Sequence, residues 1–184
     1  MKNRNLKKMI LSALFLVLGY VLPLFTSQIK EIGDTLLPMH IPVMLCGLVC
    51  GARYGLAVGF VLPFLRGIVF SMPPLYPNAL WMALELATYG FVTGFMYGRV
   101  KNPKTGYLYF CLSVSMLLGR VVWGITKTVL LGLTGKAFTF EAFLIGGFVD
   151  AFPGIVLQFI LIPFIIGVLN HLAVRSIYKK EVSK

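Results

Sequence analysis

The fold is decided by the stretch from Leu37 to Arg99, which reads LPMHIPVMLCGLVCGARYGLAVGFVLPFLRGIVFSMPPLYPNALWMALELATYGFVTGFMYGR. It is almost wholly apolar, yet it contains the charged residues Arg66 and Glu85, and prolines and glycines interrupt it repeatedly. A charge inside a bilayer costs about 3 kcal/mol or more, so charged residues in membrane helices usually face a protein interior or a pocket. Membrane helices that are broken near polar groups often line a ligand site. The stretch therefore predicts a membrane protein that binds a ligand.

The composition of the whole chain also indicates a membrane protein. Its 184 residues are 58% hydrophobic and 12% charged, with a mean hydropathy of +0.88, whereas soluble domains carry about 25% charged residues. The three cysteines, Cys46, Cys50 and Cys111, lie in apolar runs without the usual spacing of a zinc site, so we interpret them as packing residues and expect no metal and no cofactor. A single integral membrane domain over residues 1–184 is the expectation.

Six transmembrane helices are predicted, because a hydrocarbon core of about 30 Å needs roughly 20 apolar residues per helix. The expected ranges are 9–26, 40–50, 54–70, 78–97, 107–133 and 142–174. The first is interpreted as a retained helix, since no small-residue cleavage site follows its apolar run. The second is short for a full span and is expected to be tilted or partly interfacial. The sixth is long enough to tilt or to bend at Pro153 and Pro163.

The distribution of basic residues predicts the orientation, because cytoplasmic loops of membrane proteins are rich in Lys and Arg. With six spans, one side collects twelve of the seventeen basic residues: Lys2, Arg4, Lys7, Lys8, Arg53, Arg99, Lys101, Lys104, Arg175, Lys179, Lys180 and Lys184. The other side holds only Lys30 and Lys136. Both termini are therefore expected to be cytoplasmic, and the net charge of +11 reflects this distribution rather than a nucleic-acid partner.

Five ionisable residues lie inside the predicted spans, all in the outer half or near the midplane: Arg66, Glu85, Arg120, Lys127 and Asp150. Helical spacing places Arg120, Trp123 and Lys127 on one face of the fifth helix, and Asn78, Trp81, Glu85 and Thr88 or Tyr89 on one face of the fourth. Apolar walls with a few directional polar groups are typical of a small-molecule site. The candidate substrate-binding residues are Arg66, Asn78, Trp81, Glu85, Trp123, Lys127 and Asp150.

Structural roles compete with binding at each of these positions. Arg120 could pair with Asp150, and Arg66 with Glu85, simply to neutralise charge. Lys127 would then have no carboxylate and would either meet an anionic ligand or extend to the outer interface. The two tryptophans could belong to an interfacial belt, and His40 is interpreted as a capping or interface histidine rather than a ligand contact.

No catalytic residues are expected. The sequence contains no HExxH motif, no nucleophile elbow and no phosphate-binding glycine loop. It also shows no ATP site and no inverted repeat, which makes a transporter that works alone less consistent with the chain than a binding subunit that depends on partners.

The chain resembles the S components, the substrate-binding subunits of energy-coupling factor (ECF) transporters, most of all those of the folate, pantothenate, riboflavin and cobalamin group. The stretch from Leu37 to Gly98 carries the resemblance, together with VDAFPGIVLQFILIPFIIGVL from Val149 to Leu169. The resemblance implies a six-helix bundle that binds a water-soluble vitamin near the outer face. It also implies docking on a module of one membrane scaffold subunit and two ATPases in a prokaryotic plasma membrane, with the S component toppling in the membrane to deliver its ligand.

Two further points follow from the resemblance. The family's first helix docks through two alanines four residues apart. Here Ala13 is followed by Val17, so we expect close packing on the scaffold through Ser12, Ala13 and Gly19. Excess positive charge in the site favours a carboxylate ligand, with pantothenate as the first candidate; folate, niacin, riboflavin, cobalamin and thiamin remain alternatives. The alternative class is a membrane scaffold protein whose buried charges only align its helices.

Overall fold

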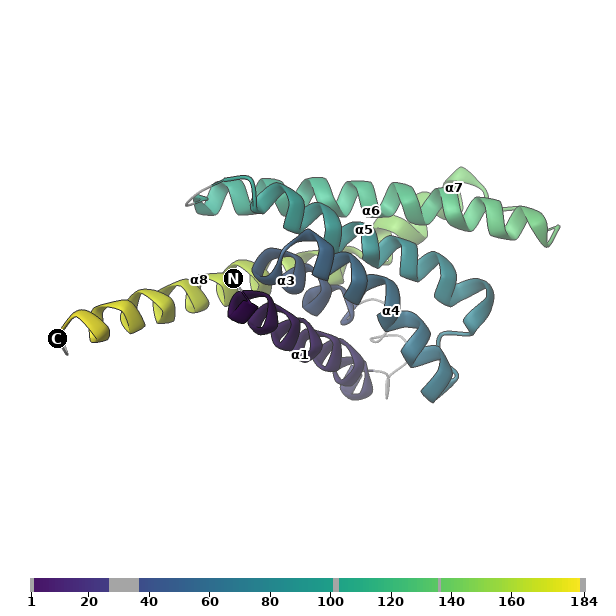
Figure 1. The fold of residues 1–184 in the computed structure, drawn as a ribbon. Coiled ribbons are helices and arrows are strands. Elements are labelled where there is room, and N and C mark those ends of the chain that lie inside the picture. Colours follow the sequence, from purple (N-terminus) through teal and green to yellow (C-terminus); the bar gives the residue numbers. More distant parts are fainter. Residues whose placement is uncertain (1, 27–36, 101–102, 136, 183–184) are drawn as a thin grey trace.

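The computed structural model is all-helical over the residues that it describes, which are 2–26, 37–100, 103–135 and 137–182. Its long helices are α1 (Lys2–Thr26), α4 (Ala52–Phe70), α5 (Leu80–Tyr97), α6 (Thr105–Leu133) and α8 (Phe152–Val182), with the shorter α3 (His40–Cys50). A wide turn, η1 (Leu75–Ala79), precedes α5, and α7 (Phe140–Leu144) with η2 (Ile145–Val149) precedes α8. In Figure 1 both ends of the chain lie toward the left and α7 lies at the right. The predicted all-α fold is confirmed.

Five helical segments are long and apolar enough to cross a membrane: Asn5–Leu24, Ala52–Phe70, Leu75–Tyr97, Thr105–Leu133 and Phe140–Leu169. The shorter α3 is apolar as well. The observed helices begin and end within a few residues of the predicted ranges at most positions. Most of the predicted outer loop Ser27–Met39 lies outside the described residues. The chain is a multi-pass membrane protein.

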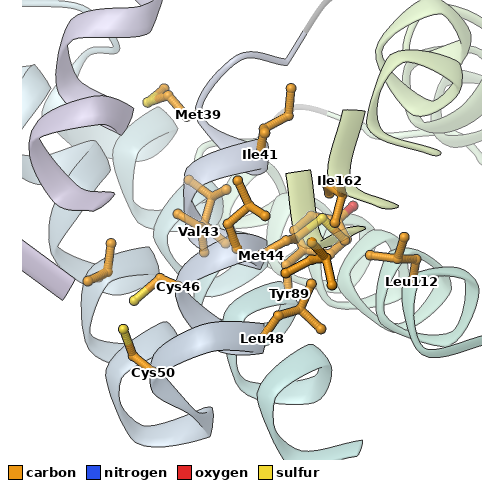
Figure 2. Close-up of a cluster of buried hydrophobic side chains, with 14 of the residues drawn as sticks. Met39, Ile41, Val43, Met44, Cys46, Leu48, Cys50, Tyr89, Leu112 and Ile162 are labelled. Atoms are coloured by element: carbon orange, nitrogen blue, oxygen red, sulfur yellow. The ribbon is translucent and has the colours of Figure 1, made fainter. Parts of the chain in front are cut away.

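The α3 helix lies at the centre of the bundle. Ten of its eleven residues are buried, Val49 being the exception, and it contacts α1, α4, α5 and α8. Figure 2 shows its apolar side chains, such as Met44 and Leu48, in one cluster with Tyr89 of α5, Leu112 of α6 and Ile162 of α8. A helix that is apolar on all sides is expected to be buried, and burial by its neighbours allows this short helix to lie inside the bundle. That it is tilted or partly interfacial in the membrane stays a prediction.

Glycines bring α3, α4 and α5 into backbone contact. A Cβ atom at Gly47 or Gly55 would collide with the backbone carbonyl of Gly90, and one at Gly59 would collide with the backbone of Leu86. Small residues allow this approach between membrane helices, where van der Waals packing replaces the hydrophobic effect as the driving force. The recurrent glycines of the Leu37–Arg99 stretch therefore fix the distance between these three helices.

The last predicted span is broken rather than gently bent. It divides at residues 145–151 into α7, the wide turn η2 and α8. Pro153 lies in the first turn of α8, where its missing N–H group leaves no hydrogen bond unmade. Gly146 and Gly147 precede it, in η2. The break thus lies on the N-terminal side of Pro153, while Pro163 is accommodated inside α8.

Candidate functional site

The candidate site begins where α5 and α6 pack side by side. The two helices are antiparallel, so their polar stripes face each other residue by residue. The Nη1 atom of Arg120 lies 3.0 Å from Oε1 of Glu85, and the Nζ atom of Lys127 lies 5.5 Å from the centre of the Trp81 ring. Spacings of three and four residues keep each stripe on one helix face, which is why the sequence indicated both stripes.

Glu85 is the centre of a buried polar cluster. Its Oε1 atom accepts a hydrogen bond from the hydroxyl of Tyr89 at 3.1 Å and lies 3.6 Å from Nε2 of His40. Glu85 is 3% exposed and Arg120 4%, and the carboxylate and the guanidinium neutralise each other. We call His40, Glu85, Tyr89 and Arg120 the polar floor of the site.

Helix α3 supplies His40 to the polar floor. His40 is its first residue, and the ring of His40 packs edge-on against Tyr89 with 5.0 Å between the ring centres. Nε2 of His40 faces Glu85, whereas Nδ1 of His40 has no hydrogen-bond partner among the described residues, and the same holds for Nε of Arg120. Buried polar atoms are nearly always hydrogen-bonded in native proteins, so these atoms indicate a position where a further polar group is accepted.

Lys127 is surrounded by aromatic rings. Its Nζ atom lies 4.5 Å from the ring centre of Trp123, 4.8 Å from that of Phe138 and 5.5 Å from that of Trp81. Within about 6 Å such rings attract a cation electrostatically. No carboxylate lies within ion-pair distance of Lys127 in the described part of the chain. We call Trp81, Trp123 and Phe138 the aromatic cage.

The polar floor and the aromatic cage form one continuous array. The guanidinium of Arg120 lies 5.8 Å from the ring of Trp123, so each member of the array contacts the next from His40 to Lys127. Seven residues of α6 separate Arg120 from Lys127, a rise of about 10 Å at 1.5 Å per residue. The site therefore has a neutralised end in the bundle interior and a cationic end near the N-terminal end of α5 and the C-terminal end of α6.

Both charge pairs considered from the sequence are wrong. Arg120 pairs with Glu85 and not with Asp150, because the Glu85 face of α5 points to α3 and α6. Asp150 is exposed in the turn between η2 and α8, where the helix break removes it from the interior. The structure therefore does not bring Asp150 into the array of α5 and α6.

Arg66 occupies a separate position between α4 and α1. It is 6% exposed, and its Nη1 atom donates to the backbone carbonyl of Tyr20 at 3.5 Å. Its guanidinium also lies 5.6 Å from the centre of the Phe70 ring. Arg66 has no ion pair within the described ranges, and the structure does not join it to the polar floor.

Three more residues lie around the same array. Asn78 was predicted from the sequence, whereas the contacts of His40 and Phe138 were not. Asn78 is partly buried in η1, about one turn before Trp81. His40 was interpreted as a capping or interface residue, but it contacts Glu85 because α3 begins level with the middle of α5. Phe138 belongs to the connection after α6, and its place in the aromatic cage depends on tertiary packing that no local pattern indicates.

The predicted docking residues of α1 do not share one face. Ser12 and Gly19 are buried, and a Cβ atom at Gly19 would meet Leu62 of α4 at 2.6 Å. Ala13 and Val17 are exposed instead. Residues seven apart, such as Ser12 and Gly19, lie on the same side of a helix, and here that side packs against the bundle. Of the three predicted docking residues, only Ala13 is on the exposed side of α1, and docking through this helix stays a prediction.

A groove of about 520 Å³ lies beside the aromatic cage, on a neighbouring face of α6. Its walls are apolar or carry hydroxyl groups: Val121, Gly124, Ile125, Thr128, Val129, Phe138, Thr139, Phe140 and Phe143. Phe138 and Phe143 separate it from Trp123, because both rings contact the indole. It has no charged lining residue, so it does not replace the array of α5 and α6 as the candidate site.

Comparison with curated proteins and with solved structures finds no match. A family model does match, and it covers residues 7–166, from the first helix into α8. That model describes the substrate-specific component of ECF transporters. Because the match spans most of the chain and both halves of the array on α5 and α6, the protein belongs to the family of ECF transporter substrate-specific components.

Proposed function

We propose that this protein captures a water-soluble vitamin at the outer face of a prokaryotic plasma membrane and delivers it through an ECF module. Its partners are a membrane scaffold subunit and two ATPase subunits, and both termini are cytoplasmic. The protein binds its substrate and releases it unchanged. Family membership supports a vitamin-type substrate, and the basic loops of the predicted inner side support the orientation.

One observation carries the choice of ligand. Lys127 presents an ammonium group inside the aromatic cage without a carboxylate partner in the described chain. Arg120, the nearest other cation of the array, is already neutralised by Glu85. An ammonium group removed from water gains most from an anion, so we infer a ligand that carries a carboxylate, with pantothenate as the first candidate.

The test is a binding titration of the detergent-purified protein with a panel of B vitamins. Trp81 and Trp123 are the two tryptophans of the chain, and both lie in the aromatic cage. We expect one anionic vitamin to quench their fluorescence saturably at sub-micromolar concentration, with calorimetry giving the same affinity. Trp123→Phe should reduce the signal change and weaken binding.

An exposed residue provides the matched control. Phe91→Leu changes an aromatic residue on the outer face of α5, and it should leave the titration unchanged. A flat calorimetric response to the whole panel would contradict vitamin binding. Such a result would favour the second candidate, a membrane scaffold in which the pair of Glu85 and Arg120 only aligns α5 with α6.

A further inference from the structure

The array of α5 and α6 has two ends of different electrostatic character, which constrains how a ligand lies in it. At the inner end, Glu85 and Arg120 neutralise each other within the polar floor. At the outer end, Lys127 is a cation that no described carboxylate neutralises. The rise of α6 between the two ends is about 10 Å, close to the length of three extended residues. A ligand whose two polar groups lie about that far apart would match both ends.

We propose that the site binds a ligand with two different polar ends, its carboxylate at Lys127 and a neutral hydroxyl or carbonyl group at His40. This inference rests on the proposed function and adds the direction in which the ligand lies. The neutral end enters first and reaches the polar floor. The anionic end stays near the outer ends of α5 and α6.

The unpartnered atoms of the polar floor support a neutral group there. His40 is 3% exposed. Its Nε2 atom faces Glu85 at 3.6 Å, and its Nδ1 atom lacks a hydrogen-bond partner among the described residues. A neutral imidazole offers one donor and one acceptor, and a hydroxyl group can satisfy either. Leaving a buried polar group without a partner is unfavourable, so a ligand hydroxyl at His40 would recover part of that free energy.

The opposite direction is disfavoured by charge and by desolvation. A carboxylate at the polar floor would lie beside the carboxylate of Glu85, which shares an oxygen with Tyr89 and Arg120. It would also lose all of its water in a region where His40, Glu85 and Arg120 are each less than 5% exposed. An ionised group without a full counter-charge is among the most costly groups to bury. Lys127 is only partly buried, so a carboxylate there retains some hydration.

The test compares pantothenate with panthenol, in which a primary alcohol replaces the carboxylate while the rest of the molecule is unchanged. Calorimetry on detergent-purified protein should show that the native chain binds pantothenate at least about 10-fold more tightly, since a hydrogen bond to a charged group contributes about 1.5–3 kcal/mol. Lys127→Met should remove this preference by weakening pantothenate alone. Lys127→Arg should retain it, and Lys104→Met, the same change at an exposed lysine before α6, should have no effect.

His40 is tested with the same two probes. His40→Phe removes the hydrogen-bonding atoms from the polar floor but keeps a ring against Tyr89, so it should weaken both probes by a similar factor and leave their ratio unchanged. His40→Gln should restore part of the affinity for both. Thermal unfolding of each variant shows that the fold is intact, and His40→Gln takes the place of His40→Phe if the latter does not fold.

Each outcome decides something different. If His40→Phe removes the preference for pantothenate and Lys127→Met weakens both probes equally, the ligand lies in the opposite direction and the inference is wrong. If the native protein binds a vitamin that has no carboxylate, the assignment of Lys127 is wrong while vitamin capture stands. If it binds no member of the vitamin panel, the proposed function itself fails and the inference fails with it.

Discussion

Ten of the eleven residues of α3 are buried, whereas α7 has no buried residue. The two sides of the bundle also differ in how closely their helices pack. On one side α3, α4 and α5 are held in backbone contact by glycines such as Gly55 and Gly90. On the other side α6 and α7 meet through large rings, including Trp123 and Phe143. The tightly packed side positions His40 and Glu85, and the aromatic side presents Lys127. The difference shows how one small bundle combines a polar floor held by backbone packing with a cationic end held by contacts between aromatic side chains.

The largest expected effect comes from enlarging a glycine on the tightly packed side. Gly90→Leu would place a side chain where even a Cβ atom collides with the backbone of Gly55, so we expect a loss of stability of about 5 kcal/mol or more. Gly132→Leu on α6, where nothing lies within 4 Å of an added Cβ atom, should be nearly neutral. Thermal unfolding in detergent measures both. Equal losses in the two variants would show that the two sides are packed alike.

A smaller loss is expected when the pair that joins the two sides is broken. Glu85→Gln leaves the buried guanidinium of Arg120 without its counter-charge, which costs about 3 kcal/mol. Combining it with Arg120→Met should destabilise less than the sum of the two single changes, because the second change removes the uncompensated charge. Thermal unfolding of the native chain, the two single variants and the double variant forms a double-mutant cycle. The cycle gives the coupling free energy between Glu85 and Arg120.

Asp150→Asn is the control for that cycle. Asp150 is exposed, so its substitution should change stability by less than about 0.5 kcal/mol. A loss at Asp150 as large as that at Glu85 would contradict the pairing described here and would restore the pair of Asp150 and Arg120.

The smallest effect on stability is expected at the outer face of α1. Ala13 is exposed, so Ala13→Leu should leave both unfolding and vitamin binding unchanged. We expect it to reduce co-purification with the ECF module, because a larger side chain prevents close approach of two membrane helices. Ala57→Leu, at an exposed alanine of α4, is the matched control. Loss of co-purification in Ala57→Leu alone would move the docking surface from α1 to α4.

The sequence was sufficient to predict the helices and the faces of α5 and α6. Apolar runs locate spans because their length must match a bilayer, and spacing of three and four residues puts Glu85 and Trp81 on one side of α5. These inferences depend only on local periodicity, which folding does not change. That Lys127 has no carboxylate partner was inferred from the pairs of Arg120 with Asp150 and of Arg66 with Glu85, which are wrong.

The partners of the buried charges could not be predicted in the same way. Which carboxylate meets Arg120 depends on the rotation of α5 about its axis and on the break before α8, which carries Asp150 out of the interior. The role of His40 depends on how deep α3 begins relative to Glu85. Small residues such as Ser12 and Gly19 serve equally well to pack α1 on its own bundle and to dock it on another protein, so the sequence could not tell that they are buried here. These are properties of tertiary packing, which a single sequence does not specify.

The short length of α3 has a consequence for permeation. Eleven residues of helix span about 16 Å, roughly half of a hydrocarbon core of about 30 Å. The residues that follow His40 in α3 are apolar, from Ile41 to Cys50, and they fill the bundle on one side of the polar floor. We therefore expect α3 to form an apolar barrier between His40 and the opposite face of the membrane. If it does, the protein alone does not conduct solutes, and vesicles that contain it should keep their ion gradients.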